Sequence, residues 1–348
     1  MRPVTPDLWP AEPDPAAALR EVAFWLEFEG ADSRRCEAFR RAAAVWTRHG
    51  GPEVTDPQKL TGLGPSTAAV VKEAMAGEVP QRLRELRERA EPVPGSDTAM
   101  YAALRGDLHT HSTWSDGGAP IADMVEVAGL LSHEYYLVTD HSPRLKVANG
   151  LDATRLQAQA DEIAALNTDL RARGRGPVVL HGSEVDILAD GGLDHSPASL
   201  DGLDAIVASV HSDLRSDAQT MTRRMVRAIA HPSTTVLGHC TGRKLARGEV
   251  VRPPSDFDAE VVFAACAAYG VAVEINARPE RQDPPEQLLE LAASAGCLFS
   301  IDSDAHATGQ LTNLALGCQR AEAVGIDADR VITTWSLERL RAWLDDRG

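Results

Sequence analysis

The stretches YYLVTDH (residues 135–141) and LFSIDSDAH (298–306) are short apolar runs that end at residues able to bind a metal ion. The same pattern recurs in LRGDLHTH (104–111), VVLHGSE (178–184), AIVASVH (205–211), TTVLGH (234–239) and VAVEINA (271–277). Short runs of valine, isoleucine, leucine and tyrosine predict buried strands, and the segments between them have the length and pattern of helices. Alternating strands and helices predict an α/β barrel with a parallel sheet.

The ends of these runs carry a set of histidines and carboxylates. Because the carboxyl ends of barrel strands open onto one face, we expect these side chains to meet there. The predicted ligands are His109, His111, Asp116, His141, Glu184, His211, His239, Asp304 and His306. Imidazole and carboxylate ligands suit Zn²⁺, Mn²⁺ or Fe²⁺. The set is too large for one ion and sufficient for two or three, and a carboxylate such as Glu184 can bridge neighbouring ions.

The composition is that of an ordinary globular protein. Of the 348 residues, 43% are hydrophobic and 25% are charged, enough for one large domain and a small one. The N-terminal MRPVTPDLWPAEPDP (1–15) lacks the apolar core of a signal peptide, and no apolar stretch is long enough to span a bilayer. Five scattered cysteines indicate a reducing compartment, so we expect a cytoplasmic protein without membrane contact. The net charge of −16 argues against strong nonspecific attraction to nucleic acid.

The composition changes at EPVPGSDTAM (91–100), which predicts a linker between two ordered regions. We expect residues 1–14 to form a disordered tail, 15–90 a helical domain, 91–103 the linker and 104–348 the barrel. Within the helical domain, Ser33 is expected to cap the second helix. The predicted helices are 15–30, 33–49, 66–76 and 79–90.

The helical domain contains LTGLGPSTAAVVKEAMAGEVP (60–80), in which Pro65 begins a helix after a glycine turn. Free N–H groups at such a helix start can hold a phosphate. The segment resembles a helix-hairpin-helix motif, and residues 15–90, including CEAFRRAAAVW (36–46), are similar to the small N-terminal domain of family X DNA polymerases. The resemblance implies DNA contacts at Gly62, Gly64 and Ser66. Val70 stands where lyase-competent relatives carry a Schiff-base lysine, so no lyase activity is expected.

The barrel region resembles the PHP (polymerase and histidinol phosphatase) domain, above all that of bacterial family X polymerases. The motifs that carry the resemblance are GDLHTHSTWSDG, YLVTDHS, GSEVDILADGGLD, ASVHS, GHCTGR, EINARPERQDP and IDSDAH. The resemblance implies a distorted (β/α)7 TIM-like barrel with three metals. Its implied metal sites are His109, His111, Glu184 and Asp304; Glu184, His211 and His239; and Asp116, His141 and His306. Cys240 departs from the proline that relatives often have there and is not a predicted ligand.

These residues predict a metal-dependent phosphoester hydrolase. Bound metals activate water and neutralise charge on a phosphoester. Arg243 and Arg281 follow strand ends and are expected to bind the substrate phosphate, with Asn276 in a similar place.

Three kinds of function stay open from the sequence. The first is a DNA-end enzyme, such as a 3′→5′ exonuclease, a 3′-phosphatase or an abasic-site nuclease. The second is a small-molecule phosphomonoesterase of the histidinol-phosphatase type, which the acidic net charge favours. The third is a non-catalytic DNA-binding protein, against which the complete ligand set speaks. An amidohydrolase also begins with His-x-His on a barrel strand, but it does not need Glu184 and Asp304 at these positions. Polymerase activity is excluded because the linker 91–103 is too short to hold a nucleotidyltransferase palm. The sequence does not indicate an oligomeric state.

Overall fold

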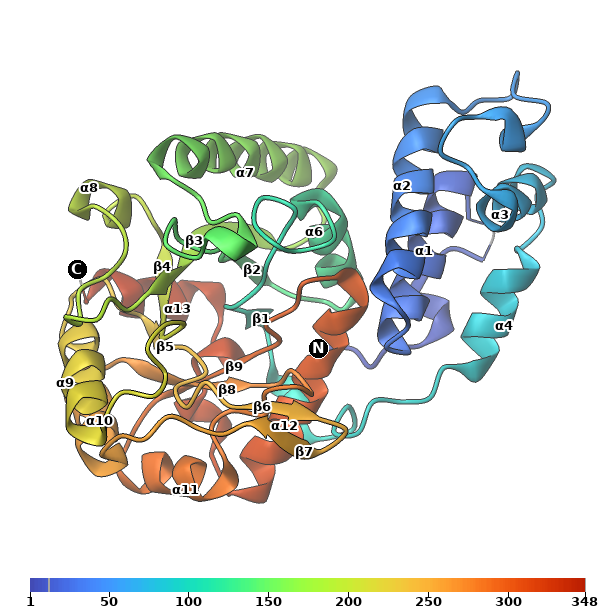
Figure 1. Ribbon diagram of the computed structural model, residues 1–348. Coiled ribbons are helices and arrows are strands. Elements are labelled where there is room, and N and C mark those ends of the chain that lie inside the picture. Colours follow the sequence, from blue (N-terminus) through green and yellow to red (C-terminus); the bar gives the residue numbers. More distant parts are fainter. Residues whose placement is uncertain (12, 348) are drawn as a thin grey trace. The chain divides into compact units, whose positions relative to one another are not determined.

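Seven strands form one parallel sheet whose order follows the chain, as Figure 1 shows. They are β1 (Gly106–Asp107), β2 (Tyr135–Val138), β3 (Val178–Asp186), β4 (Ala205–Ser209), β5 (Val236–Leu237), β8 (Ala272–Asn276) and β9 (Phe299–Asp302). The computed structural model describes residues 1–11 and 13–347. A parallel bridge between Thr110 and Ala305 joins the two outer strands, and the backbone N–H of His111 donates to the carbonyl oxygen of Ala305 at 2.8 Å. The expected parallel barrel is therefore confirmed.

Helices connect the strands or follow the last one, and they cover the outside of the barrel (Figure 1). They are α6 (Ile121–Leu130), α7 (Ala153–Arg173), α8 (Pro197–Leu200), α9 (Ala218–Ile229), α10 (Ala259–Tyr269), α11 (Glu286–Ser294), α12 (Leu314–Ala323) and α13 (Leu337–Asp345). Local sequence sets several of their ends. The side chains of Asp152, Asp217 and Asp258 accept backbone N–H groups at the starts of α7, α9 and α10. Gly174 and Gly270, both with positive φ, end α7 and α10.

A two-stranded antiparallel ribbon interrupts the alternation between β5 and β8. It consists of β6 (Lys244–Ala246) and β7 (Glu249–Arg252), and the turn passes through Arg247 and Gly248 with φ of 52° and 82°. Lys244 stands directly opposite Arg252 in the register. The sequence analysis did not predict this ribbon, which hereafter is called the β6–β7 ribbon.

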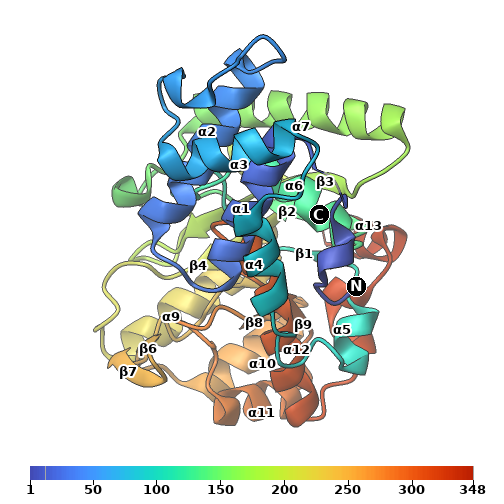
Figure 2. The ribbon, with the colours of Figure 1, turned by 90° about the vertical axis from the view of Figure 1, so that its right-hand side faces the viewer.

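The described chain divides into two units. The helical unit comprises residues 3–92 with 307–312, and the barrel unit comprises the remainder. The helices of the helical unit, α1 (Pro15–Phe28), α2 (Ser33–His49), α3 (Pro65–Met75) and α4 (Gln81–Arg89), confirm the four that the sequence predicts, and Figure 2 shows them from the side. Asp32, rather than Ser33, caps α2, because its side chain accepts the backbone N–H of Arg34.

The core of the helical unit holds a buried ion pair. The guanidinium of Arg87 donates to both carboxylate oxygens of Glu21 at 2.7 Å, and the indole N–H of Trp25 donates to Glu21 Oε1 at 3.0 Å. Burial raises the pKa of Glu21, and the contacts with Arg87 and Trp25 oppose that rise. One carboxylate thus links α1 to α4 inside the unit.

Two segments differ from the expectations for a tail and a linker. Within residues 1–14, Pro6–Leu8 form a 3-10 turn, and the ring of Trp9 lies 4.5 Å from that of Phe24, because the indole buries its surface against α1. Within residues 91–103, Ala99–Ala103 form helix α5, whose Met100 and Tyr101 are buried in the barrel core. Short 3-10 turns also occur at Pro57–Lys59, Lys146–Ala148, Thr308–Asn313, Ala328–Arg330 and Ile332–Thr334. No helix in the described parts of the chain has the length and apolarity needed to cross a membrane.

Candidate metal centre

The predicted ligands come together at the carboxyl ends of the barrel strands. His109, His211 and His239 each lie two residues beyond the end of a strand. Glu184 lies two residues before the end of β3. His111 and His141 lie slightly further along their loops, and Asp304 and His306 follow β9. The barrel thus delivers residues nearly 200 positions apart in the sequence to one site, because parallel strands all point the same way.

Glu184 is the centre of the cluster. Its Oε1 lies 2.8 Å from Nε2 of His239 and 3.2 Å from Nε2 of His211. Its Oε2 lies 2.9 Å from Nδ1 of His141 and 3.4 Å from Nε2 of His109. Nε2 of His111 is also near, at 3.6 Å from Oε2. One carboxylate therefore faces five imidazoles, an arrangement that suits a ligand bridging more than one ion.

A second part of the cluster surrounds Asp116. Its Oδ1 lies 3.5 Å from Nε2 of both His141 and His306 and 3.9 Å from Nδ1 of His111. Asp304 closes the cluster on the other side, with Oδ1 3.4 Å from Nε2 of His111. The groups whose donor atoms lie close enough to hold an ion are His111, Asp116, His141 and His306; His109, His111 and Glu184; and His141, Glu184 and His211.

The donor set fits divalent metals. Nε2 of His109 and Nε2 of His111 approach each other to 3.2 Å, so two ring nitrogens are directed at one place. Nδ1 of His239 and Oε1 of Glu184 are buried and make no hydrogen bond with any described residue. Burial opposes the ionisation of Glu184, yet the facing imidazoles of His211, His109 and His141 hold its pKa well below the usual range. Buried nitrogen and oxygen donors that face one another without hydrogen bonds are the chemistry of a metal site.

Buried carboxylates orient the histidines from behind. Glu274 Oε1 lies 2.5 Å from Nδ1 of His109, and its Oε2 accepts the backbone N–H of His239. Asp186 contacts Nδ1 of His211 in the same way. Such contacts fix which ring nitrogen faces the metal. The sequence analysis missed Glu274, although its position two residues before Asn276 in a buried strand is an unusual place for a charge.

Asp107 and Asp302 form a further layer beneath the cluster. Asp107 accepts the backbone N–H groups of His109 and Ser303, each at 3.2 Å, and Asp302 accepts that of Leu108 at 3.0 Å. Burial raises the pKa of Asp107 to about 7, against the opposing effect of its hydrogen bonds with Ser303 and His109. These two carboxyl groups hold the segment that carries His109 against the segment that carries Asp304.

A cavity of about 350 Å³ opens onto the cluster. Asp116, His141, Glu184, His211, Asp304 and His306 line its floor. Four cationic side chains also line it: Lys244, Arg252, Arg278 and Arg281. Of these, only Arg281 was predicted from the sequence. Nε of Arg281 lies 3.6 Å from Asp304 Oδ2, and Nη1 of Arg278 lies 3.5 Å from Asp304 Oδ1.

Arg243 and Asn276 make contacts with protein groups near the cluster. Nε of Arg243 donates to the carbonyl oxygen of Arg281 at 3.1 Å, and its Nη2 donates to that of Gln282, so the side chain holds a loop and does not line the cavity. Asn276 is fully buried, and its Nδ2 donates to Asp304 Oδ2 at 3.1 Å. Both side chains thus have polar atoms engaged by protein groups, and their contact with a substrate phosphate stays a prediction.

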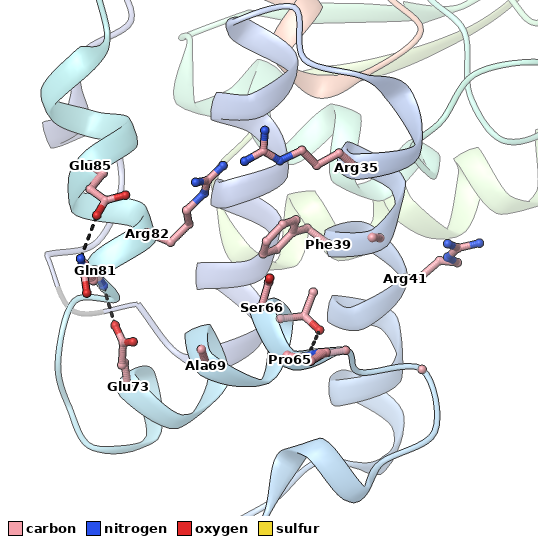
Figure 3. Close-up of a pocket in the computed structure, with 14 residues that line it drawn as sticks. Arg35, Phe39, Arg41, Pro65, Ser66, Ala69, Glu73, Gln81, Arg82 and Glu85 are labelled. Carbon is pink, nitrogen blue, oxygen red and sulfur yellow. Dashed lines mark hydrogen bonds between the residues drawn. The ribbon is translucent and has the colours of Figure 1, made fainter.

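The helical unit has a cavity of its own, of about 580 Å³, drawn in Figure 3. Gly62, Gly64 and Ser66 line it at the start of α3, as do Arg35 of α2 and Arg82 of α4. The two guanidinium groups point toward the same region in Figure 3, and Gly64 is the residue that precedes α3.

A buried valine occupies the position at which lyase-competent relatives carry a Schiff-base lysine. Val70 is 1% exposed and carries no amine, while Nζ of Lys72 lies 3.2 Å from Asp56 at the surface. Residue 70 therefore supplies no amine for imine chemistry.

Comparison with known proteins supports the resemblance in the motifs. No protein-family model matches the chain. The chain is 33% identical over 267 residues to the DNA polymerase/3'-5' exonuclease PolX of Bacillus subtilis, an alignment that covers 76% of this chain and 45% of the relative. It is 28% identical over 263 residues to a probable phosphatase of Vibrio campbellii, covering 70% of this chain and 94% of that protein.

The histidinol phosphate phosphatase of Lactococcus lactis, complexed with zinc, L-histidinol and phosphate, aligns with a TM-score of 0.49 at 15% identity, over 64% of this chain and 95% of that one. The chain spans less than half the length of the Bacillus polymerase, although it covers nearly all of the Vibrio phosphatase. The chain is thus similar in sequence to a protein named as a DNA polymerase/3'-5' exonuclease and to a probable phosphatase, and its parallel barrel carries the motifs that resemble a PHP domain.

Proposed function

We propose that the protein is a metal-dependent phosphoester hydrolase that acts on DNA ends. The observation that carries the hydrolase assignment is the cluster around Glu184, in which one buried carboxylate faces five imidazoles beneath a cationic cavity. Two or three divalent ions held there would supply a nucleophile from water at neutral pH and neutralise charge on the phosphoryl oxygens. The physiological ions proposed are zinc, manganese or iron.

The protein's own residues position the substrate. Arg278 and Arg281 flank Asp304 at the edge of the cluster, so their guanidinium groups can bind the non-bridging oxygens of the phosphoester. Asn276 and Glu274 keep Asp304 and His109 in place from the buried side. Catalysis in this arrangement rests on orientation and charge, without a serine, cysteine or lysine nucleophile.

Two observations support DNA as the substrate. The helical unit has a cavity in which Arg35, Arg82 and the start of α3 converge, and such a cavity suits a phosphate of a DNA backbone (Figure 3). The relative in Bacillus subtilis is named as a 3'-5' exonuclease. The proposed reaction is therefore removal of nucleotides or a phosphate from a 3′ end, with the helical unit holding the DNA.

A small-molecule phosphomonoesterase is the second candidate. The alignment with the Vibrio protein named as a probable phosphatase covers 70% of this chain and 94% of that protein. Little of that relative therefore lies outside the aligned region. The net charge of −16 also disfavours a polyanionic substrate. A non-catalytic DNA-binding protein is a weaker candidate, because it would not need the complete ligand cluster.

The test is hydrolysis of a 5′-labelled DNA duplex by the full-length protein in the presence of Mn²⁺. We expect a ladder of shortened products, and a weaker one from the Arg35→Ala/Arg82→Ala variant. The matched control is Arg34→Ala/Arg84→Ala, which removes the same charge from the same two helices outside the cavity.

The outcomes separate the candidates. Unshortened DNA together with hydrolysis of small phosphate monoesters would favour the phosphomonoesterase. A ladder that both double variants weaken equally would leave DNA-end hydrolysis standing and remove the helical cavity as its anchor. Absence of hydrolysis with every substrate, from protein that contains metal, would contradict the hydrolase assignment.

A further inference from the structure

Two cationic side chains of the β6–β7 ribbon line the cavity above the cluster. The hydrolysis of a single phosphate does not require them. Lys244 and Arg252 are directly opposed across the ribbon, and directly opposed residues of an antiparallel pair project from the same face. Both line the cavity that holds Arg278 and Arg281. The cavity therefore has two pairs of cations, one beside Asp304 and one on the ribbon.

The two pairs differ in how their charges are compensated. Arg278 and Arg281 each lie within 3.6 Å of a carboxylate oxygen of Asp304. No carboxylate among the described residues forms an ion pair with Lys244 or with Arg252. Arg252 is nevertheless held in place, since its Nε donates to the carbonyl oxygen of Gly242 at 2.7 Å.

Lys244 lies among the other cationic side chains of the cavity lining, and Asp304 offsets their effect only in part. Partial burial and the neighbouring Arg281, Arg252 and Arg278 lower its pKa. Burial and Arg281 likewise lower the pKa of Arg252. Such repulsion is relieved when an anion binds among the cations.

The remaining lining of the cavity is aliphatic. It comes from Leu145, Val147, Ala148, Val210 and Leu214. Val147 is 95% exposed, an unusual degree for a large apolar side chain at the mouth of a polar site. The cavity thus offers cations along one part of its lining and apolar surface along another, which suits a ligand with both phosphates and a ring system.

We propose that Lys244 and Arg252 bind a second phosphate of the substrate, next to the phosphate that is hydrolysed, while the aliphatic lining contacts the nucleoside between them. The preferred substrate is then a nucleic-acid strand end with at least two consecutive phosphates. This inference rests on the proposed phosphoester hydrolysis. Under this proposal, the β6–β7 ribbon makes the protein prefer a nucleic-acid strand over a phosphate monoester, and this preference does not depend on the helical unit.

The test compares two short substrates that differ by one nucleotide and therefore by one phosphate and one nucleoside. Thymidine dinucleotide TpT has a single phosphodiester, and the trinucleotide TpTpT has the 3′-terminal phosphodiester and one neighbouring phosphate. We expect kcat/KM of the full-length, metal-loaded protein to be about 10- to 100-fold higher for TpTpT, the range for charge-assisted contacts to one phosphate. The variant Lys244→Ala/Arg252→Ala should lose this preference, mainly through KM, so that its kcat/KM falls by a much larger factor for TpTpT than for TpT.

Two control variants make the comparison specific. Arg247→Asn removes a charge from the turn of the same ribbon, outside the cavity lining, and keeps a residue that tolerates positive φ. It should retain the preference for TpTpT. Lys244→Arg retains the charge and should retain most of the preference.

Binding supplies a readout that does not depend on hydrolysis. Fluorescence anisotropy of 5′-labelled TpTpT should show weaker binding to the double variant, and the slope of log K against log [salt] should become about 0.7 shallower for one lost phosphate contact. Equal loss of activity on TpT and TpTpT, or an unchanged preference in the double variant, would overturn the second-phosphate site. Wild-type protein that binds TpTpT through Lys244 and Arg252 but hydrolyses neither substrate would overturn the proposed function instead.

Discussion

Glu274→Gln is the substitution that most directly tests how the cluster is built. The carboxylate is fully buried and contacts two predicted ligands on different strands, through Nδ1 of His109 at 2.5 Å and the backbone N–H of His239. Glutamine has the same shape but only one acceptor oxygen, so one of these two contacts must be lost. Loss of such an orienting contact typically weakens metal affinity by about 10- to 100-fold, which is about 1.4–2.8 kcal/mol.

The assay is a competition titration of metal-free protein with Zn²⁺ against a chromophoric chelator, with thermal unfolding to confirm the fold. Glu290→Gln, an exposed substitution on α11, is the matched control and should bind zinc like the wild type. Wild-type zinc affinity in Glu274→Gln would refute the reasoning, because it would mean that the orientation of His109 and His239 does not depend on this carboxylate. The readout is affinity, so the result does not depend on knowing the substrate.

Three further predictions concern the site and the two units. Asp304→Asn should lower hydrolysis of p-nitrophenyl phosphate to below about 1% of the wild-type rate with unchanged circular dichroism, since it removes charge from a predicted ligand; substantial remaining activity would exclude Asp304 as a ligand. Glu21→Ala should destabilise the helical unit by about 3 kcal/mol in urea unfolding, because it leaves the largely buried guanidinium of Arg87 without its carboxylate and with only the carbonyl oxygen of Pro10 as acceptor; Glu21→Ala/Arg87→Met should recover most of this, and no recovery would assign the loss to packing. Burial, and next the N-terminal ammonium, lower the pKa of His133 to about 3 from 6.5. The neutral ring therefore stabilises the fold fully above pH 6.5, and this contribution is lost as pH falls toward 3, by about 3 kcal/mol between pH 7 and pH 4. The difference in unfolding free energy between wild type and His133→Leu should change by that amount over this range, and a difference independent of pH would contradict the assignment.

The clustering of the predicted ligands could be foreseen from the sequence because most of them stand close to the end of a recognisable strand. His141, His211 and His239 follow apolar runs directly, and the topology of a parallel barrel then brings them together. No particular long-range side-chain contact has to be known for these three residues. The strand pattern of the sequence is therefore enough to predict that they lie close together.

Residues whose part depends on a distant partner were not accessible in this way. Glu274 lies inside an apolar run, and its contact with His109 spans 165 positions in the sequence. The contacts of Arg243 with the carbonyl groups of Arg281 and Gln282 likewise reach a loop 38 residues away in the sequence. The β6–β7 ribbon escaped prediction because its short strands are largely exposed and lack the apolar run that marks the barrel strands.

The place where the barrel closes has a consequence for folding. The bridge between Thr110 and Ala305 joins the first strand to the last, together with the side-chain contacts of Asp107 and Asp302, and the predicted ligands His109 and Asp304 lie on opposite sides of that seam. An ion could be bound by both His109 and Asp304 only when the barrel is closed. A ligand present at 100 times its Kd stabilises the state that binds it by about 2.7 kcal/mol. Chelation should therefore speed amide hydrogen exchange at His111, whose N–H crosses the seam, more than exchange between β3 and β4. The ions would therefore stabilise the closed barrel as well as take part in hydrolysis.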